Sequence, residues 1–99
     1  MKEQETKERL KKDGQDWILQ DDTLAKTFTF PDFRGAMAFV HKVADIAERQ
    51  KHHPRIIIEY DEVTLETTTH EESGITEKDF SLINAIEALL TWLIFQAKN

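Results

Sequence analysis

The chain has 99 residues, of which 13 are Lys or Arg and 19 are Asp or Glu, so its formal net charge is −6. A chain of this length buries one hydrophobic core, and we therefore expect a single domain over residues 1–99. The acidic balance argues against direct binding of nucleic acid, which needs a basic surface. The sequence has no cysteine, which excludes disulfides and thiolate chemistry and fits a reducing compartment, here expected to be the cytoplasm.

The composition is that of a soluble globular protein, with 39% hydrophobic and 32% charged residues. The N-terminal residues contain no apolar segment of the kind that a signal peptide needs, so we expect none. No uninterrupted apolar run, that at residues 93–95 included, is long enough to span a bilayer, so we expect no membrane partner.

Residues 2–13 are almost entirely polar and predict a solvated helix, prone to fraying, that Gly14 ends. Only Leu10 offers this segment an apolar anchor. Acidic and basic side chains recur four residues apart, a spacing that favours attraction along a helix: Glu3 and Lys7, Glu5 and Arg9, Glu8 and Lys12.

Residues 16–20 and 23–30 predict a β-hairpin that turns at Asp21 and Asp22. Asp32 is a good N-cap for a following helix, which should run to about Lys51 because Pro54 forces the residue before it into an extended conformation. Two sets of apolar residues recur at helical spacing in this segment, a main stripe of Phe33, Met37, Val40, Ala44 and Ala47 and a flanking set of Phe39, Val43 and Ile46.

A second hairpin follows, with its turn expected at Asp61 and Glu62. Ile56, Ile58 and Tyr60 alternate along its first arm. On the second arm one face is expected to be buried and the other polar: Val63, Leu65, Thr67 and Thr69 form the first, and Glu62, Thr64, Glu66, Thr68 and His70 form the second.

The last helix is expected to start at Thr76, where Thr76 and Asp79 form a capping-box-like pair, and to end near Ala97. Its apolar residues occupy two stripes and surround the helix between residues 89 and 95, which is more apolar surface than one small sheet can cover. We therefore expect a second copy of the chain to pack on this helix, in a homodimer or homotetramer. The stripes are Phe80, Ile83, Leu90 and Ile94, and Leu82, Ile86, Leu89 and Leu93, with Trp92 and Phe95 beside them.

The order of elements predicts an α+β fold, in which a four-stranded antiparallel sheet carries helices packed on one face, as a two-layer sandwich.

Three of the four histidines fall between residues 48 and 79. This stretch therefore holds most of the side chains that could take part in catalysis. Histidine gains and loses protons near neutral pH, so several in one pocket indicate acid–base chemistry. Glu48 precedes His52 by four residues and is expected to orient it from the same helix face, while His53 points elsewhere. His70 approaches from the last strand, and Asp79 is a second carboxylate able to orient a histidine.

Each of these residues also has a structural interpretation, as a helix cap or a surface ion pair. Zinc held by three histidines is a sharper alternative. Against it, the adjacent His52 and His53 aim poorly at one ion and the chain has no HExxH pair, so we expect no metal. His41, in the middle of a helix, is interpreted as a surface or packing residue.

The motif Glu48-x-x-x-His52-His53-Pro54, then Tyr60, Thr69-His70 and Gly74-x-Thr76-x-x-Asp79, resembles the signature of the pterin-4a-carbinolamine dehydratases. The resemblance extends upstream through Trp17, the Phe28-x-Phe30 strand, Asp32-Phe33 and Phe39, so it runs from Gln15 to the C-terminal helix and leaves the polar N-terminal segment outside. One departure is Ile56, which stands where some members carry an aromatic residue.

The resemblance implies a cytoplasmic hydro-lyase that converts 4a-hydroxytetrahydrobiopterin, or a related pterin, to the quinonoid dihydropterin during cofactor recycling. It implies no metal and no bound cofactor, and dimers or tetramers that use the C-terminal helix. By the same resemblance, His52 and His70 are the acid–base pair and His53 helps to hold the pterin. Glu48 and Asp79 orient the histidines, and Thr68 and Thr69 bind the pyrimidinone edge.

A second function is implied by the same family, in which some members serve as a dimerisation cofactor of a transcription factor or resemble an assembly factor of a carbon-fixing enzyme. Such a non-catalytic scaffold, coactivator or assembly factor is the alternative to the dehydratase. The intact set of three histidines and two carboxylates favours catalysis.

Overall fold

The computed structural model describes residues 1–97 of the chain. Three α-helices, four strands and one short 3₁₀ turn follow one another along it: α1 (Glu3–Asp13), β1 (Ile18–Gln20), β2 (Thr23–Thr29), α2 (Phe33–Gln50), β3 (Arg55–Glu59), β4 (Glu62–Thr67), η1 (His70–Glu72) and α3 (Glu77–Ala97).

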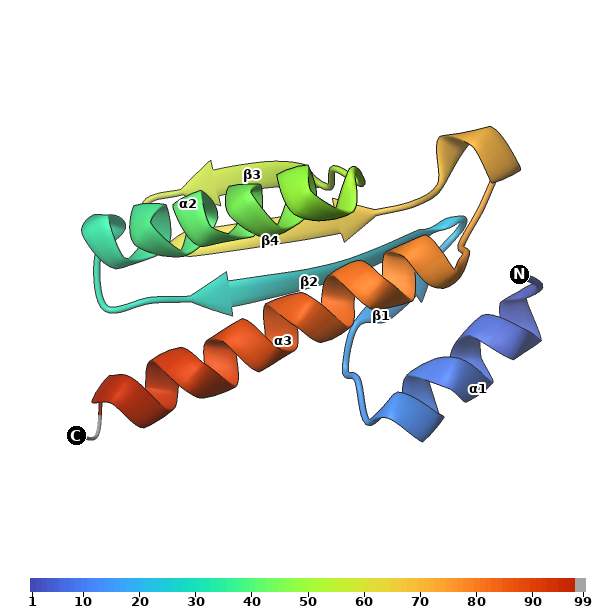
Figure 1. Ribbon diagram of the computed structural model, residues 1–99, viewed down its shortest axis with the longest axis horizontal. Coiled ribbons are helices and arrows are strands. Elements are labelled where there is room, and N and C mark those ends of the chain that lie inside the picture. Colours follow the sequence, from blue (N-terminus) through green and yellow to red (C-terminus); the bar gives the residue numbers. More distant parts are fainter. Residues whose placement is uncertain (98–99) are drawn as a thin grey trace.

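The four strands form one antiparallel sheet in the order β1-β2-β4-β3. Helices α2 and α3 lie across the same face of this sheet (Figure 1). The other face, which we call the open face, carries exposed side chains such as Ile18, Thr27 and Ile57. The predicted α+β two-layer arrangement is therefore confirmed.

Strand β4 shows the alternation on which the fold depends. Its residues Val63, Leu65 and Thr67, together with Thr69 just beyond it, are buried against the helices, as predicted. The intervening residues face the open side and are exposed or half-buried. The hairpin turn before β4 lies at Tyr60 and Asp61, one residue earlier than predicted, because Glu59 and Glu62 are already paired.

Helix α2 begins as predicted, with the Asp32 carboxylate accepting a hydrogen bond from the Gly35 N–H at 2.8 Å. Its buried face includes Ala47 of the stripe predicted as the main one, and Val40 of that stripe packs against the core, but the face is not centred on that stripe. The flanking set Phe39, Val43 and Ile46 is buried, whereas Phe33 is 50% exposed and Ala44 is exposed. Both sets satisfy helical spacing, and only contact with the sheet selects between them.

Helix α1 is more firmly attached than its polar sequence predicts. Leu10 is buried as expected, and Thr6 is buried beside it. Arg9 does not pair with Glu5 in this structure; it pairs with Asp13 and Glu77 and lies 4.8 Å from the centre of the Phe80 ring. Gly14, in the left-handed conformation, ends the helix as predicted.

Helix α3 begins at the predicted cap, since Lys78 N–H donates to the Thr76 hydroxyl and Thr76 N–H donates to the Asp79 carboxylate. Its first half fills the core, but Trp92 and Ile94 in its second half are 53% and 57% exposed. The helix is also long and apolar enough to cross a membrane by length and composition alone. This is weak evidence for a membrane span, because core helices of soluble proteins have the same properties.

Candidate functional site

The end of α2 separates the two adjacent histidines. Lys51 adopts the left-handed conformation there, so the chain leaves the helical path before His52. As a result, the Glu48 carboxylate meets Nε2 of His53, five residues on, and not His52. The predicted pairing of Glu48 with His52 is wrong, because it assumed that helical spacing continues past Gln50.

His52 instead turns into the interior, where its Nε2 lies 2.7 Å from Oδ1 of Asp79. Asp79 is fully buried in the first turn of α3, and His52 is almost fully buried. The expectation that Asp79 lies where it can orient a histidine is met at His52.

Three further donors saturate the Asp79 carboxylate. The Thr67 hydroxyl donates to Oδ1 at 2.6 Å, and the Thr69 hydroxyl and Thr76 N–H donate to Oδ2 at 2.7 and 2.9 Å. Burial on its own raises the pKa of this carboxyl, but the hydrogen bonds from Thr67, Thr69, His52 and Thr76 outweigh burial and lower the pKa below its usual value.

An ionised Asp79 determines which nitrogen of His52 carries a proton. A carboxylate only accepts hydrogen bonds, so Nε2 of His52 must be the donor. In the neutral ring the other nitrogen, Nδ1, is then an acceptor. Within residues 1–97 Nδ1 has no hydrogen-bond partner, and it is not fully buried, so solvent or a ligand can reach it.

The other two histidines of the motif meet on the open face. A hollow of about 160 Å³ at the end of the sheet is lined by Thr23, His53, Arg55, Glu66, Thr68 and His70, and we call it the histidine pocket. The strand register explains its composition. Glu66 lies on the open side of β4 and is paired with Arg55 of β3, and Thr68 follows just beyond the end of β4. His70 is the first residue of the 3₁₀ turn η1 and is not part of the last strand, where it had been expected.

The structure thus divides the predicted site residues into two groups. His53, His70 and Thr68 line the histidine pocket, with Glu48 behind His53. His52, Thr69 and Asp79 form a buried cluster on the helix side of the same strand. The Thr69 hydroxyl is used by Asp79, and its backbone N–H is bonded to Gly74.

Four residues of these two groups were missed from the sequence: Thr23, Arg55, Glu66 and Thr67. Thr67 gave a usable signal, since it is a polar residue on the predicted buried face of β4. Glu66 gave another, because it shares the polar face with Thr68 and His70. Thr23 and Arg55 join the pocket only through strand pairing, since Thr23 directly precedes Leu24, which pairs with Thr67, and Arg55 pairs with Glu66.

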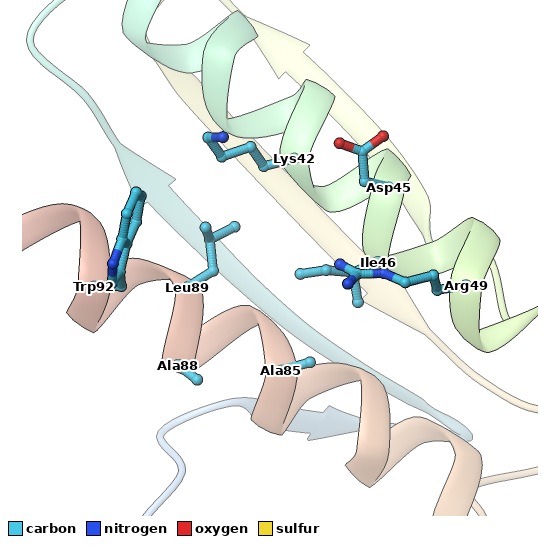
Figure 2. Close-up of a pocket in the computed structure, with 8 residues that line it drawn as sticks. All are labelled: Lys42, Asp45, Ile46, Arg49, Ala85, Ala88, Leu89 and Trp92. Atoms are coloured by element: carbon cyan, nitrogen blue, oxygen red, sulfur yellow. The ribbon is translucent and has the colours of Figure 1, made fainter.

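A larger hollow of about 440 Å³ lies between α2 and α3, and Figure 2 shows the residues that line it. Its charged side chains are Lys42, Asp45 and Arg49, and Trp92 and Leu89 face them from α3. It holds no histidine, so it lacks a group that exchanges protons near neutral pH. Within residues 1–97, no cluster of His, Cys, Asp or Glu is suited to holding a metal ion.

Comparison with known families settles which class of protein carries this arrangement. The model of the pterin 4 alpha carbinolamine dehydratase family matches residues 1–89. The chain belongs to the pterin-4a-carbinolamine dehydratase family. The family match includes α1, so the expectation that the N-terminal segment lies outside the resemblance is wrong.

Relatives from distant organisms agree. Proteins of Thermomicrobium roseum and Sulfurisphaera tokodaii, both carrying the provisional name pterin-4-alpha-carbinolamine dehydratase, are 49% and 42% identical to this chain. The first alignment covers 74% of this chain and 78% of the relative, and the second covers 90% and 95%.

Solved structures of dehydratase-like proteins share the fold. A transcriptional coactivator/pterin dehydratase from Brucella melitensis superposes with a TM-score of 0.79 at 31% identity, over 89% of this chain and 95% of that one. A pterin dehydratase-like protein identified as a RuBisCO assembly factor in the alpha-carboxysome superposes with a TM-score of 0.63 over 78% and 92%. At 20% identity, this second match shows the fold alone.

Proposed function

We propose that this protein is a hydro-lyase that removes water from 4a-hydroxytetrahydrobiopterin, or a related 4a-hydroxytetrahydropterin, to give the quinonoid dihydropterin. Membership of the dehydratase family supports the reaction class. The observation that carries the proposal is the histidine pocket, in which His53 and His70 face one hollow on the open side of the sheet.

The reaction needs two proton transfers. The bond between C4a and its hydroxyl oxygen breaks as that oxygen is protonated and leaves as water. The N5 lone pair forms the new double bond to C4a, and the N5 proton is lost. Imidazoles that titrate near neutral pH serve as both acid and base in such steps.

In this proposal His53 and His70 act on the pterin directly, because they line the pocket. Glu48 orients His53, and Asp79 orients His52 so that its Nδ1 is the free nitrogen. Thr68 contributes a hydroxyl to the pocket wall. The family resemblance gives His52 a direct part beside His70, and the kinetic test in the Discussion separates these two assignments.

The proposal includes the cellular setting that the family implies. The protein acts in the cytoplasm, needs neither metal nor bound cofactor, and recycles a pterin that a hydroxylase has used. It binds neither nucleic acid nor membrane directly.

The proposal also includes self-association through α3, in a homodimer or homotetramer. Trp92 and Ile94 are exposed, and a hollow of about 470 Å³ beside this half of the helix is lined mostly by apolar side chains, among them Phe30, Phe39 and Leu93. A second copy of α3 would cover this surface.

A non-catalytic scaffold is the second candidate function. It is favoured by the structural neighbour from Brucella melitensis, which is described as a transcriptional coactivator/pterin dehydratase. As a scaffold, coactivator or assembly factor, the protein would use the same fold without turning over a pterin.

A stopped-flow assay with enzymatically generated 4a-hydroxytetrahydropterin tests the proposal. We expect the purified protein to accelerate dehydration well above the uncatalysed rate, with unchanged rates after chelator treatment. Absence of any acceleration would reject the dehydratase and favour the scaffold. Loss of activity on chelation would instead revive the zinc alternative.

A further inference from the structure

The histidine pocket contains one carboxylate, that of Glu66. Arg55 donates to it across the strand pair, from Nη1 to Oε1 at 3.0 Å. The Glu66 side chain is 28% exposed and therefore oriented by its neighbours, whereas the Arg55 side chain is 70% exposed. On its other side Glu66 is paired with Ala25 of β2.

A pterin presents three polar groups in a row along its pyrimidinone edge. The 2-amino group and N3–H are donors, and the oxygen on C4 is an acceptor. A carboxylate accepts two parallel N–H bonds, as it does from a guanidinium group, and an adjacent guanidinium donates to a carbonyl oxygen. Glu66 and Arg55 together therefore offer the complementary row of two acceptors and one donor.

The side chains of the neighbouring threonines and of Glu48 do not offer this row. Thr23 and Thr68 each bring a single hydroxyl, and the Thr69 hydroxyl already donates to Asp79. Glu48 is paired with His53 and does not line the pocket.

We propose that Glu66 and Arg55 form the subsite that recognises the 2-amino-4-oxo edge of the pterin, and so determine which ring system enters the histidine pocket. The inference rests on the proposed function and specifies its substrate recognition. Glu66 does not touch the reacting C4a and N5 atoms in this arrangement, because the edge that it binds is at the other end of the pyrimidine ring.

The kinetic test is Glu66→Gln, which keeps the shape of the side chain and turns one acceptor into a donor. We expect the KM for the 4a-hydroxytetrahydropterin to rise by about 10- to 100-fold, the usual effect of losing a hydrogen bond to a charged group, with kcat within a few-fold of wild type. Glu62→Gln is the matched control, since Glu62 lies on the same face of β4 and outside the pocket.

A binding test uses pterin and 4-hydroxypteridine, which lacks only the 2-amino group, in isothermal titration calorimetry. We expect wild type to bind pterin about 10-fold or more tightly than 4-hydroxypteridine and Glu66→Gln to bind both alike. This comparison on wild type holds even if the variant fails to fold, which circular dichroism would reveal.

The outcomes are distinct for the two proposals. An active wild type that binds both compounds equally, or a Glu66→Gln enzyme with the KM of Glu62→Gln, overturns the recognition subsite and leaves the dehydratase intact. A wild type that neither dehydrates the substrate nor binds pterin overturns the dehydratase itself and the subsite with it.

Discussion

The histidines differ in what surrounds them, and their substitution should therefore have different consequences. His53 and His70 are exposed on the open face, whereas His52 is hydrogen-bonded to a buried carboxylate. Substitution of a pocket histidine, His53 or His70, can change activity without changing the free energy of unfolding. Substitution of His52 should also lower the free energy of unfolding, because the buried Asp79 carboxylate then loses one of its hydrogen-bond donors.

We expect His53→Ala and His70→Ala each to lower turnover by about 100-fold or more, the usual contribution of a positioned acid or base. Their free energies of unfolding should stay within about 0.5 kcal/mol of wild type, as for other surface substitutions. Stopped-flow kinetics and urea denaturation measure the two quantities. His41→Ala, at an exposed position of α2, is the control and should change neither.

His52→Ala should lower the free energy of unfolding by about 1–3 kcal/mol, because a buried acceptor loses a partner. If His52→Ala and His70→Ala abolish turnover while His53→Ala is nearly as active as wild type, the assignment by family resemblance is correct and ours is not. Near-wild-type turnover in all three variants would contradict acid–base catalysis by histidine.

The lowered pKa of Asp79 predicts how stability depends on pH. The folded pKa lies below the unfolded one, so the unfolded chain binds more protons between the two values. The contribution of Asp79 is therefore fully present above the unfolded pKa and is lost as the pH falls through the folded pKa. Urea denaturation at a series of acidic pH values measures this loss.

We expect Asp79→Asn to be destabilised at pH 7 and to lose less stability than wild type on acidification. Asp16 and Glu77 also have lowered pKa values, from pairing with Lys26 and Arg9, so some acid dependence should persist in the variant. Asp45→Asn, on the exposed side of α2, is the control. An unchanged acid dependence in Asp79→Asn would contradict the proposed role of this carboxylate.

At the scale of elements, α1 shows how a polar segment becomes part of a fold. Its sequence predicts a solvated helix with one anchor, and helix propensity decides little beyond that. In the structure Leu10 and Thr6 are buried, and Arg9 joins the helix to Glu77 at the start of α3. Fraying is therefore opposed by tertiary contacts that local spacing does not reveal.

We expect Leu10→Ala to lower the free energy of unfolding by about 2–4 kcal/mol, because it removes a buried side chain and leaves a cavity. Lys11→Ala, its exposed neighbour on the same helix, should change stability by less than about 0.5 kcal/mol. Urea denaturation followed by circular dichroism measures both. Equal stability of the two variants would show that α1 is not docked in solution.

For the whole molecule, the exposed second half of α3 predicts self-association. We expect analytical ultracentrifugation of wild type to give a mass above that of one chain, and Ile94→Ser to shift the equilibrium toward monomer. Ile18→Ser is the control, because Ile18 is 67% exposed but lies on the open face of the sheet. A monomeric wild type at micromolar concentration would contradict the association.

The alternation in β4 and the cap of α3 follow from local physics, so they could be read from the residues. A strand places successive side chains on opposite faces, which predicted the buried Thr67 and Thr69 and the polar Thr68 and His70. The order of the predicted elements indicated the α+β class. The grouping of three histidines indicated the candidate site, and the spacing of the motif indicated the family.

Only the tertiary structure decided which side chains contact one another, because these contacts depend on where separate elements meet. The left-handed Lys51 redirected Glu48 to His53 and His52 to Asp79. The packing of α2 on the sheet buried Phe39, Val43 and Ile46 and left Phe33 half exposed, although all four fit helical spacing. Strand pairing brought Arg55 beside Glu66, and so built a pocket wall from residues that are distant in sequence and carry no shared local pattern.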